Sequence, residues 1–304
     1  MKSFIITIDT EGDNLWQHTK GQKITTQNAL FIPRFQTLCA KFGFKPVYLT
    51  NYEMALCDNF VKQSKAWIEE GSAEIGVHLH AWNNPPLFEL SGPYDYNPYL
   101  IEYNLEQREA KFKEIYNLIK DRFGIVPVSH RAGRWAMDID YFKLLHSYGI
   151  KTDCSITPGI DWSKNVGITR GGSDYTHAEK FPTLIEGVLE VPMTIRKLHH
   201  CKEGSLKHRA KTLIKGEPVW LRPATQSLQM MKALIDIVSK EHDSNYLEFM
   251  IHSSELMPGG SPYFKDKESI ERLYTSMEHI FKYVQIMGYK GMTLHEYYMQ
   301  HTTK

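Results

Sequence analysis

Phe4-Ile5-Ile6-Thr7-Ile8-Asp9-Thr10-Glu11-Gly12-Asp13 is the stretch that decides the fold. Its first five residues are rich in β-branched side chains, which is typical of a buried strand. The strand leads directly into Asp9, Glu11 and Asp13, three carboxylates at alternate positions. An apolar strand that ends in acids places charge at the carboxyl edge of a parallel sheet, where binding sites form. A solvated acidic turn is the alternative interpretation.

Strands and helices alternate along the rest of the chain. We expect strands at 46–50, 73–78, 126–130, 150–155, 188–191 and 246–251, and helices at 25–42, 59–70, 105–123, 139–147, 225–241 and 268–287. This alternation predicts a parallel sheet with helical crossovers. We therefore expect an α/β protein, a distorted parallel (β/α) barrel, built as a single domain over residues 1–304.

Composition excludes several classes of function. The chain has 304 residues, 42% apolar residues and a formal net charge of +1, so it offers no electrostatic attraction for nucleic acid or an anionic membrane. No apolar run is long enough for a transmembrane segment. The four cysteines are scattered without a Cys-x-x-Cys pair, so neither a zinc knuckle nor a disulfide framework is indicated. Asp9 follows only eight residues, which leaves no room for a signal peptide, so a cytoplasmic location is expected.

Polar side chains follow four of the expected strands. They are Asp9 and Glu11, His78 and His80, His130 and Arg131, and His252. In a barrel of parallel strands these ends converge on one face, so acids, imidazoles and a guanidinium would meet there. Each residue alone is a weak signal, and their coincidence is the informative one.

His78 and His80 are candidate metal ligands, because neutral imidazole binds zinc and similar cations. Side chains two residues apart on a regular strand share one face, so both can reach one ion if the strand stays extended. The alternative is that only one of them points inward, in which case water or Asp13 would take the place of His80. His199 and His200 match no strand end and are expected at the surface.

Five short motifs occur in one order between residues 7 and 252. They are Thr7-Ile8-Asp9-Thr10-Glu11, Glu74-Ile75-Gly76-Val77-His78, Arg131-Ala132-Gly133-Arg134-Trp135, Asp161-Trp162 and Phe249-Met250-Ile251-His252. This ordered set resembles the polysaccharide deacetylase family, also called carbohydrate esterase family four or the NodB-homology domain. Two positions depart from the family pattern. Trp82 stands where the second histidine is usual, which makes His80 a displaced candidate, and Gly133 replaces a proline. The departures indicate a divergent branch.

The resemblance implies a seven-stranded barrel and metal-dependent removal of an acetyl group from an N-acetylated sugar in a glycan or glycan precursor. It implies that Glu11, His78 and His80 bind a divalent cation, with zinc the expected ion. Asp9 would be the general base, with its pKa lowered by Arg131.

The resemblance also assigns groups around the substrate. His252 would protonate the leaving amine, with Asp161 as its partner. Backbone N–H groups near Arg134 would help to stabilise the oxyanion. Trp82, Arg134, Trp135 and Trp162 would contact the sugar, although an aromatic loop packed on the barrel rim is an equally good interpretation of residues 81–103.

Two other classes of function fit the same residues. One is a metal-dependent hydrolase of a different amide or of an ester. The other is a glycan-binding protein with a degenerate site. The presence of both Asp9 and His252 argues against binding alone, because binding needs neither a base nor an acid.

Overall fold

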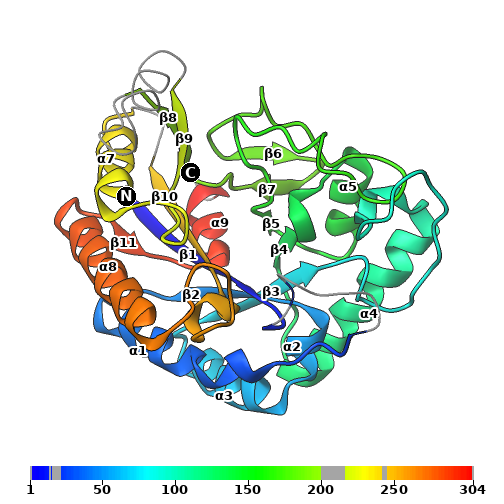
Figure 1. The fold of residues 1–304 in the computed structure, drawn as a ribbon, viewed down its shortest axis with the longest axis horizontal. Coiled ribbons are helices and arrows are strands. Elements are labelled where there is room, and N and C mark those ends of the chain that lie inside the picture. The colour runs from blue at the N-terminus through cyan, green and yellow to red at the C-terminus, as the bar shows by residue number, and fades with distance from the viewer. Residues whose placement is uncertain (1, 14, 16–21, 200–215, 242–244, 303–304) are drawn as a thin grey trace.

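A curved sheet of parallel strands forms the centre of the molecule, described here from a computed structural model (Figure 1). The structure describes residues 2–13, 15, 22–199, 216–241 and 245–302. Within these residues the main sheet has nine strands. They are β1 (Ser3–Thr10), β2 (Pro46–Thr50), β3 (Glu74–Leu79), β4 (Ser129–Ala132), β5 (Thr152–Asp153), β6 (Thr183–Ile185), β7 (Val188–Glu190), β10 (Tyr246–His252) and β11 (Lys290–Gly291).

The strand order is β10-β1-β2-β3-β4-β5-β7-β6, and β11 pairs with β1 beside this path. The run from β10 to β7 contains seven strands that are all parallel to their neighbours. β6 is antiparallel to β7 and widens the sheet at one edge. The predicted distorted parallel barrel is therefore confirmed. Its parallel path has the expected seven strands, and β6 and β11 bring the whole sheet to nine.

Helices cover the outer face of the sheet, as Figure 1 shows. They are α1 (Ile32–Lys41), α2 (Tyr52–Leu56), α3 (Asp58–Glu69), α4 (Leu105–Phe123), α5 (Ile139–Ser147), α7 (Leu228–Val238) and α8 (Lys267–Ile286), whereas α9 (Leu294–Thr302) packs on the inner side. Helix α4 illustrates why these segments are helical. A capping box of Asn104 and Gln107 starts it, and Gly124 in the left-handed conformation ends it.

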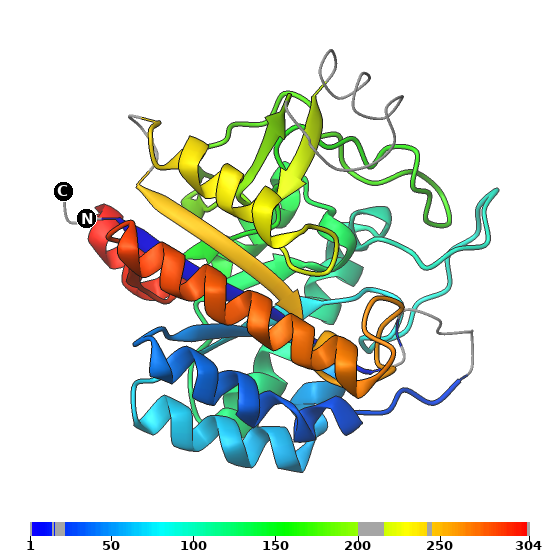
Figure 2. The ribbon, with the colours of Figure 1, turned by 60° about the vertical axis from the view of Figure 1, so that its left-hand side comes forward.

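The two faces of the sheet are buried in different ways. On the outer face, Phe4 of β1 and Phe249 of β10 contact Phe281 of α8, with ring centroids 5.7 and 5.5 Å away. Figure 2 shows α8 lying along β10. The inner cluster is apolar and includes Ile5 of β1 and Tyr246 of β10, together with Leu294 and Tyr297 of α9. Helix α9 thus packs against the amino-terminal end of the barrel interior, and polar groups are concentrated at the other end.

A second, two-stranded sheet lies beside the barrel. β8 (Ile195–Leu198) and β9 (Glu217–Trp220) form an antiparallel pair in a region where the sequence pattern predicts little regular structure. The residue after β9 is fixed on both sides. The Leu221 N–H donates to the Thr194 carbonyl (3.1 Å), and the Leu221 carbonyl accepts from the Met250 N–H of β10 (3.2 Å). This ribbon therefore brings the segment after β9 to the carboxyl end of β10.

The sequence predicts that the chain has no transmembrane segment, and the lengths and compositions of the helices can be compared with this prediction. None of the described helices is both long enough and apolar enough to cross a membrane.

Candidate active site

A cavity of about 400 Å³ lies at the carboxyl ends of the parallel strands. Eleven residues are predicted from the sequence to form a site, and nine of them line this cavity: Asp9, Glu11, His78, His80, Trp82, Arg134, Trp135, Trp162 and His252. Of the other two, Arg131 lies behind Asp9 and contacts it, and Asp161 does not line the cavity. The convergence of strand ends that the alternation predicts therefore occurs.

Glu11, His78 and His80 place one potential ligand atom each within 4.8 Å of the others. Nε2 of His80 lies 2.9 Å from Oε2 of Glu11 and 3.0 Å from Nε2 of His78. Nε2 of His78 lies 3.6 Å from the same Glu11 oxygen. A tetrahedral zinc ion with bonds of about 2.0–2.2 Å separates its ligand atoms by about 3.3–3.6 Å. The observed separations are close to that range, so the three side chains fit a divalent cation.

The orientation of His78 supports the same interpretation. Its Nδ1 lies 2.9 Å from the carbonyl oxygen of Arg131, which can only accept, so Nδ1 carries the ring proton. The lone pair on Nε2 then points toward Glu11 and His80. A second hydrogen bond of this kind is how proteins fix the ring of a metal-binding histidine.

Electrostatics keep Glu11 in the form that binds cations. Burial opposes its ionisation, but His252, His78 and His80 hold the pKa of its carboxyl well below the usual range. Burial lowers the pKa of His80, which favours the neutral imidazole that a metal requires. The pKa of His78 is raised despite its burial, because Asp9 and Glu11 face it. These two carboxylates are thus the negative charges that a bound cation would neutralise.

Gly133 explains how His80 fits. His80 follows the end of β3, and its ring contacts the indole of Trp82 edge to face at 5.6 Å. A Cβ on residue 133 would lie 2.5 Å from the carbonyl oxygen of Leu79 and 3.0 Å from two atoms of the His80 ring. Only glycine leaves this space open. Gly133 therefore leaves the space that the His80 ring and the Leu79 carbonyl occupy.

Asp9 is held by the fully buried Arg131. Nη1 of Arg131 donates to Oδ1 of Asp9 (2.6 Å), and Nη2 donates to Glu248 and to the Thr7 hydroxyl. Burial opposes ionisation of Asp9, but Arg131, His78 and His252 lower its pKa below the ordinary value. The predicted contact between Arg131 and Asp9 is present, and its effect on the pKa has the predicted direction.

His252 faces the same space from β10. Its Nε2 lies 3.7 Å from Oδ2 of Asp9 and 3.7 Å from Oε1 of Glu11. On the other side of the ring, Nδ1 lies 3.0 Å from Nη2 of Arg222 and 3.6 Å from Oε2 of Glu255. His252 is thus placed between the two acids of β1 and a second charged pair.

Asp161, the partner predicted for His252, lies elsewhere. It is exposed and pairs with Asp174 in an isolated bridge, and its Oδ1 accepts a hydrogen bond from the Ser163 N–H (2.8 Å). Its carboxylate is occupied by the local turn, which is a common arrangement for aspartate in loops. Among the residues that the structure describes, Arg222 and Glu255 lie beside Nδ1 of His252.

His130 also differs from the expected convergence. Adjacent strand residues point to opposite faces, so His130 points away from the face on which Arg131 lies. Its ring is buried between Asp153 (2.6 Å from Nδ1) and the Tyr141 hydroxyl of α5 (2.8 Å from Nε2). His199, expected at the surface, is exposed, and His200 lies outside the described residues.

Tryptophans form one wall of the cavity. Trp135 and Trp162 both contact Trp220 of β9, with ring centroids 5.8 and 6.4 Å away. Arg134 and Trp135 have φ values of 57° and 62°, in the left-handed region that side chains other than glycine seldom adopt. Surrounding contacts hold this turn. The Arg134 guanidinium stacks on Tyr99 at 3.9 Å and donates to the Val166 carbonyl (3.0 Å).

Three charged residues near the site were missed from the sequence: Glu248, Glu255 and Arg222. Glu248 and His252 lie on the same face of β10, because they are an even number of residues apart on the strand. An acid at such a position in an otherwise apolar strand could have been recognised from the sequence. Burial raises the pKa of Glu248 to about 7, although Arg131 opposes the rise. Arg222 gave no signal, because the sequence around it has no periodicity.

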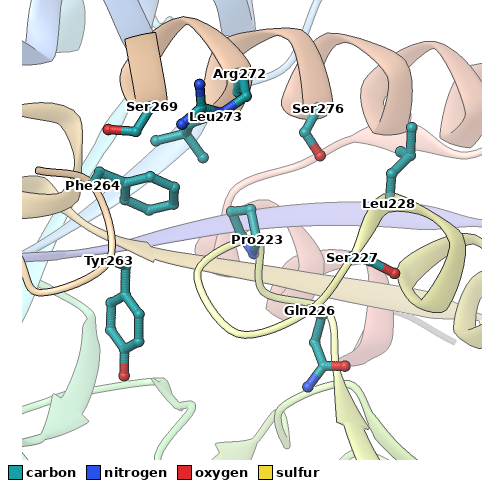
Figure 3. A pocket seen from close by; sticks show the side chains of 10 residues that line it. All are labelled: Pro223, Gln226, Ser227, Leu228, Tyr263, Phe264, Ser269, Arg272, Leu273 and Ser276. Atoms are coloured by element: carbon teal, nitrogen blue, oxygen red, sulfur yellow. The ribbon is translucent and has the colours of Figure 1, made fainter. Parts of the chain in front are cut away.

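A second cavity of about 250 Å³ lies between the start of α7 and helix α8 (Figure 3). Its walls are formed by Pro223, Gln226, Ser227, Leu228, Tyr263, Phe264, Ser269, Arg272, Leu273 and Ser276. This lining contains no carboxylate, imidazole or thiol. The groups needed for acid–base or metal chemistry therefore lie in the first cavity.

Comparisons with known proteins find solved structures with a similar fold. No family model and no curated protein matches the chain. Among solved structures, a GH57-type branching enzyme from Pyrococcus horikoshii is 10% identical, with a TM-score of 0.55 over 99% of this chain and 70% of that one. A 4-alpha-glucanotransferase from Thermococcus litoralis is 12% identical, with a TM-score of 0.51, and the match covers 99% of this chain and 38% of that one.

Carbohydrate esterases of family 4 are also among the similar structures. An acetyl xylan esterase of that family from Clostridium thermocellum, in complex with a cobalt ion, is 12% identical. Its TM-score is 0.48, and the match covers 98% of this chain and 91% of that one. At these identities the likenesses describe the fold, and the function has to be argued from the site.

Proposed function

We propose that this protein is a metal-dependent hydrolase that removes the N-acetyl group from an acetamido sugar. The observation that carries the proposal is the set of groups that meet in one cavity. It holds three side chains that could bind a metal ion, a carboxylate kept ionised by a buried arginine, and an imidazole that faces the carboxylates. A metal-dependent hydrolase of unactivated amides uses these three functions.

Glu11, His78 and His80 would hold the divalent cation, with zinc favoured by the two imidazoles and one carboxylate. When bound, the ion supplies a Lewis acid that polarises the acetamide carbonyl and makes water more acidic. Three protein ligands leave a coordination position open for this chemistry.

Asp9 would act as the general base. Water attacks the carbonyl carbon, and Oδ2 of Asp9 accepts one of its protons, since Oδ1 is occupied by Arg131. The C–N bond then breaks, and the nitrogen gains a proton, which gives the free amine and acetic acid. His252 faces this region through Nε2 and would be the donor to the leaving nitrogen.

The cavity walls support a sugar as the substrate. Trp82, Trp135 and Trp162 offer broad apolar faces, and Arg134 supplies hydrogen-bond donors beside them. Rings of this kind cover the C–H faces of a sugar while polar groups contact its hydroxyls. The cytoplasmic location, and a lipid-linked or nucleotide-linked carrier for the sugar, stay predictions.

Acetate release from acetylated sugar oligomers, with and without chelator, tests the proposal. We expect chelator-sensitive release in the wild type and a loss of about two to four orders of magnitude in Asp9→Asn and His252→Ala. Release from other amides or from acetyl esters alone would instead support the alternative hydrolase. Binding of oligomers without any release would support a glycan-binding protein.

The same assay distinguishes a glycosyl-transfer reaction from deacetylation. Glycosidic cleavage uses a pair of carboxylates and needs no cation. Changes in glucan chain length that persist in chelator would therefore contradict the proposal, whereas acetate release that stops in chelator and returns with added zinc would support it.

A further inference from the structure

Arg222 lines the same cavity as His252, and the ribbon of β8 and β9 places it there. It follows Leu221, whose backbone is bonded to Thr194 on one side and to Met250 of β10 on the other. Its side chain is largely buried and contacts two groups through Nη2: Nδ1 of His252 (3.0 Å) and Oε1 of Glu255 (2.7 Å). Arg222 is therefore held against the ring of His252 by the backbone bonds of the preceding residue and by its own ion pair with Glu255.

The chemistry of these partners determines where the ring proton of His252 lies. A guanidinium has only N–H donors, so the ring nitrogen that it contacts must accept with a lone pair. Nδ1 is that nitrogen. Glu255 does not accept a proton from Nδ1, because its Oε2 is 3.6 Å away, beyond hydrogen-bond distance. That oxygen already accepts a hydrogen bond from the backbone N–H of His252 (2.9 Å). The neutral ring then carries its proton on Nε2.

We propose that Arg222 is a positioning residue that keeps the proton of His252 on Nε2, directed into the cavity. Nε2 lies 3.7 Å from an oxygen of Asp9 and from an oxygen of Glu11, so its N–H points toward the reacting groups. With the opposite tautomer, a lone pair would face two carboxylates and Nδ1–H would face the N–H of Arg222. Arg222 thus makes the ring a donor at the place where a donor is needed.

This arrangement refines the proposed reaction, and its kinetic consequence rests on the proposed function. His252 would act as a neutral hydrogen-bond donor to the nitrogen or oxygen on which negative charge develops, a role that neutral imidazole takes in other enzymes. The proton that completes the leaving amine would then be the one that Asp9 removed from water. Asp9 would take one proton from water and give the same proton to the leaving nitrogen. No protonated form of His252 is then needed to complete the reaction.

NMR of the imidazole nitrogens tests the proposal independently of activity. Long-range ¹H–¹⁵N correlation of histidine-labelled protein distinguishes the two tautomers, and His252→Gln identifies the signals of His252. We expect the Nε2–H tautomer in the wild type. In Arg222→Met we expect Nδ1–H to become the major form, because Oε2 of the freed Glu255 carboxylate already lies 3.6 Å from Nδ1 and needs only a small shift to reach hydrogen-bond distance. The Nδ1–H tautomer in the wild type, or no change in Arg222→Met, would overturn the proposal.

Variants and kinetics separate positioning from a merely structural role. Arg222→Lys is the second variant, for use if Arg222→Met fails to fold. It keeps a donor at this position and should retain most of the Nε2–H form. Arg272→Met is the matched control, since Arg272 is an exposed arginine of α8 that lines the second cavity. We expect kcat for acetate release to fall about 10- to 100-fold in Arg222→Met with KM unchanged, and to stay at the wild-type level in the control. If no substrate releases acetate, the proposed function fails while the tautomer measurement still decides the role of Arg222.

Discussion

Gly133 and His80 show how two residues that are far apart in the sequence depend on each other. Sequence reasoning predicts His80 as a ligand because it shares a strand face with His78. It treats glycine at 133 as a separate anomaly. The structure places the missing Cβ of Gly133 against the His80 ring and the Leu79 carbonyl. The two positions are 53 residues apart in number, so only the pairing of β3 with β4 reveals their connection.

Gly133→Ala should weaken metal binding. The new methyl group would push on the Leu79 carbonyl, which is rigid backbone, and on the ring of His80. Displacement of one ligand or of its support commonly costs about 10- to 100-fold in metal affinity. Competition for zinc against a chromophoric chelator measures the change. Gly124→Ala, at the end of α4, is the control for general destabilisation. Equal zinc affinity in both variants and in the wild type would show that His80 does not need this space.

Asp9→Asn should separate catalysis from metal binding. Asparagine keeps the shape and the contact with Arg131 but cannot accept a proton from water. The rate of acetate release should fall by about two to four orders of magnitude, with zinc content retained. Asp13→Asn is the matched control, because Asp13 accepts from the Gln27 N–H (3.3 Å) and lies outside the three-residue ligand set. A normal rate in Asp9→Asn would remove Asp9 from the role of base.

At the scale of elements, the long periodic segments were the predictable ones. The observed bounds of α4 and α5 and of β2 agree with the expected ranges. β4 was expected at 126–130 and lies at Ser129–Ala132. Pro127 has no N–H to give to a neighbouring strand, so pairing begins after it. The β8–β9 ribbon was missed because strands of four residues carry too few positions to show an alternation.

Lys111 ties the loop that carries Trp82 to helix α4. It is buried, and its ammonium donates to the carbonyl oxygens of Ala81 (2.9 Å), Asn84 (2.9 Å) and Pro86 (2.7 Å). The three N–H donors of the ammonium group thus match three backbone acceptors. These hydrogen bonds hold the loop in place although it contains no regular secondary structure. Sequence patterns indicate a helix here, and they cannot indicate that one lysine of that helix points inward.

Lys111→Met should destabilise the protein and loosen this loop. The three carbonyl groups would lose their donor while buried, and unsatisfied buried groups cost about 1–3 kcal/mol each before relaxation. We expect a loss of roughly 2–5 kcal/mol in unfolding free energy, measured by urea titration, and faster proteolysis within residues 81–90. Lys113→Met, at an exposed position of the same helix, should change the free energy by less than about 0.5 kcal/mol. Equal stability of the two variants would contradict this role.

At the scale of the whole molecule, the barrel divides into an apolar end and a charged end. The alternation of strands and helices, together with the polar residues at the strand ends, predicts the charged end, because parallel strands bring all their carboxyl ends to one side. The contact of Arg131 with Asp9 was predicted, but the pairing of charged groups around His252 was not. Glu255, for example, is buried with Arg222 and His252, and these two hold its pKa at about 2 although burial opposes its ionisation.

Glu255 should make stability depend on acid pH. A carboxyl with a pKa of about 2 in the folded chain and 4.5 in the reference state contributes stability above pH 4.5. That contribution, at most about 3 kcal/mol, is lost as pH falls from 4.5 toward 2. Urea unfolding from pH 5 to pH 3 should therefore show a smaller decline in Glu255→Gln than in the wild type. Parallel declines in the two proteins would assign the acid sensitivity to other carboxyl groups.

Metal binding should raise the stability of the whole chain. Asp9 and Glu11 are buried beside His78 and His80, and a divalent cation would compensate for this cluster of charge. A ligand at 100 times its Kd stabilises the folded state by about 2.7 kcal/mol, which corresponds to roughly 5 °C in Tm for a chain of this size. Thermal unfolding with excess zinc and with chelator measures the difference. His78→Ala should abolish it, because two remaining ligands bind zinc weakly, whereas the exposed His199→Ala should keep it. A zinc-dependent shift that survives in His78→Ala would place the cation elsewhere and remove the basis of the proposed chemistry.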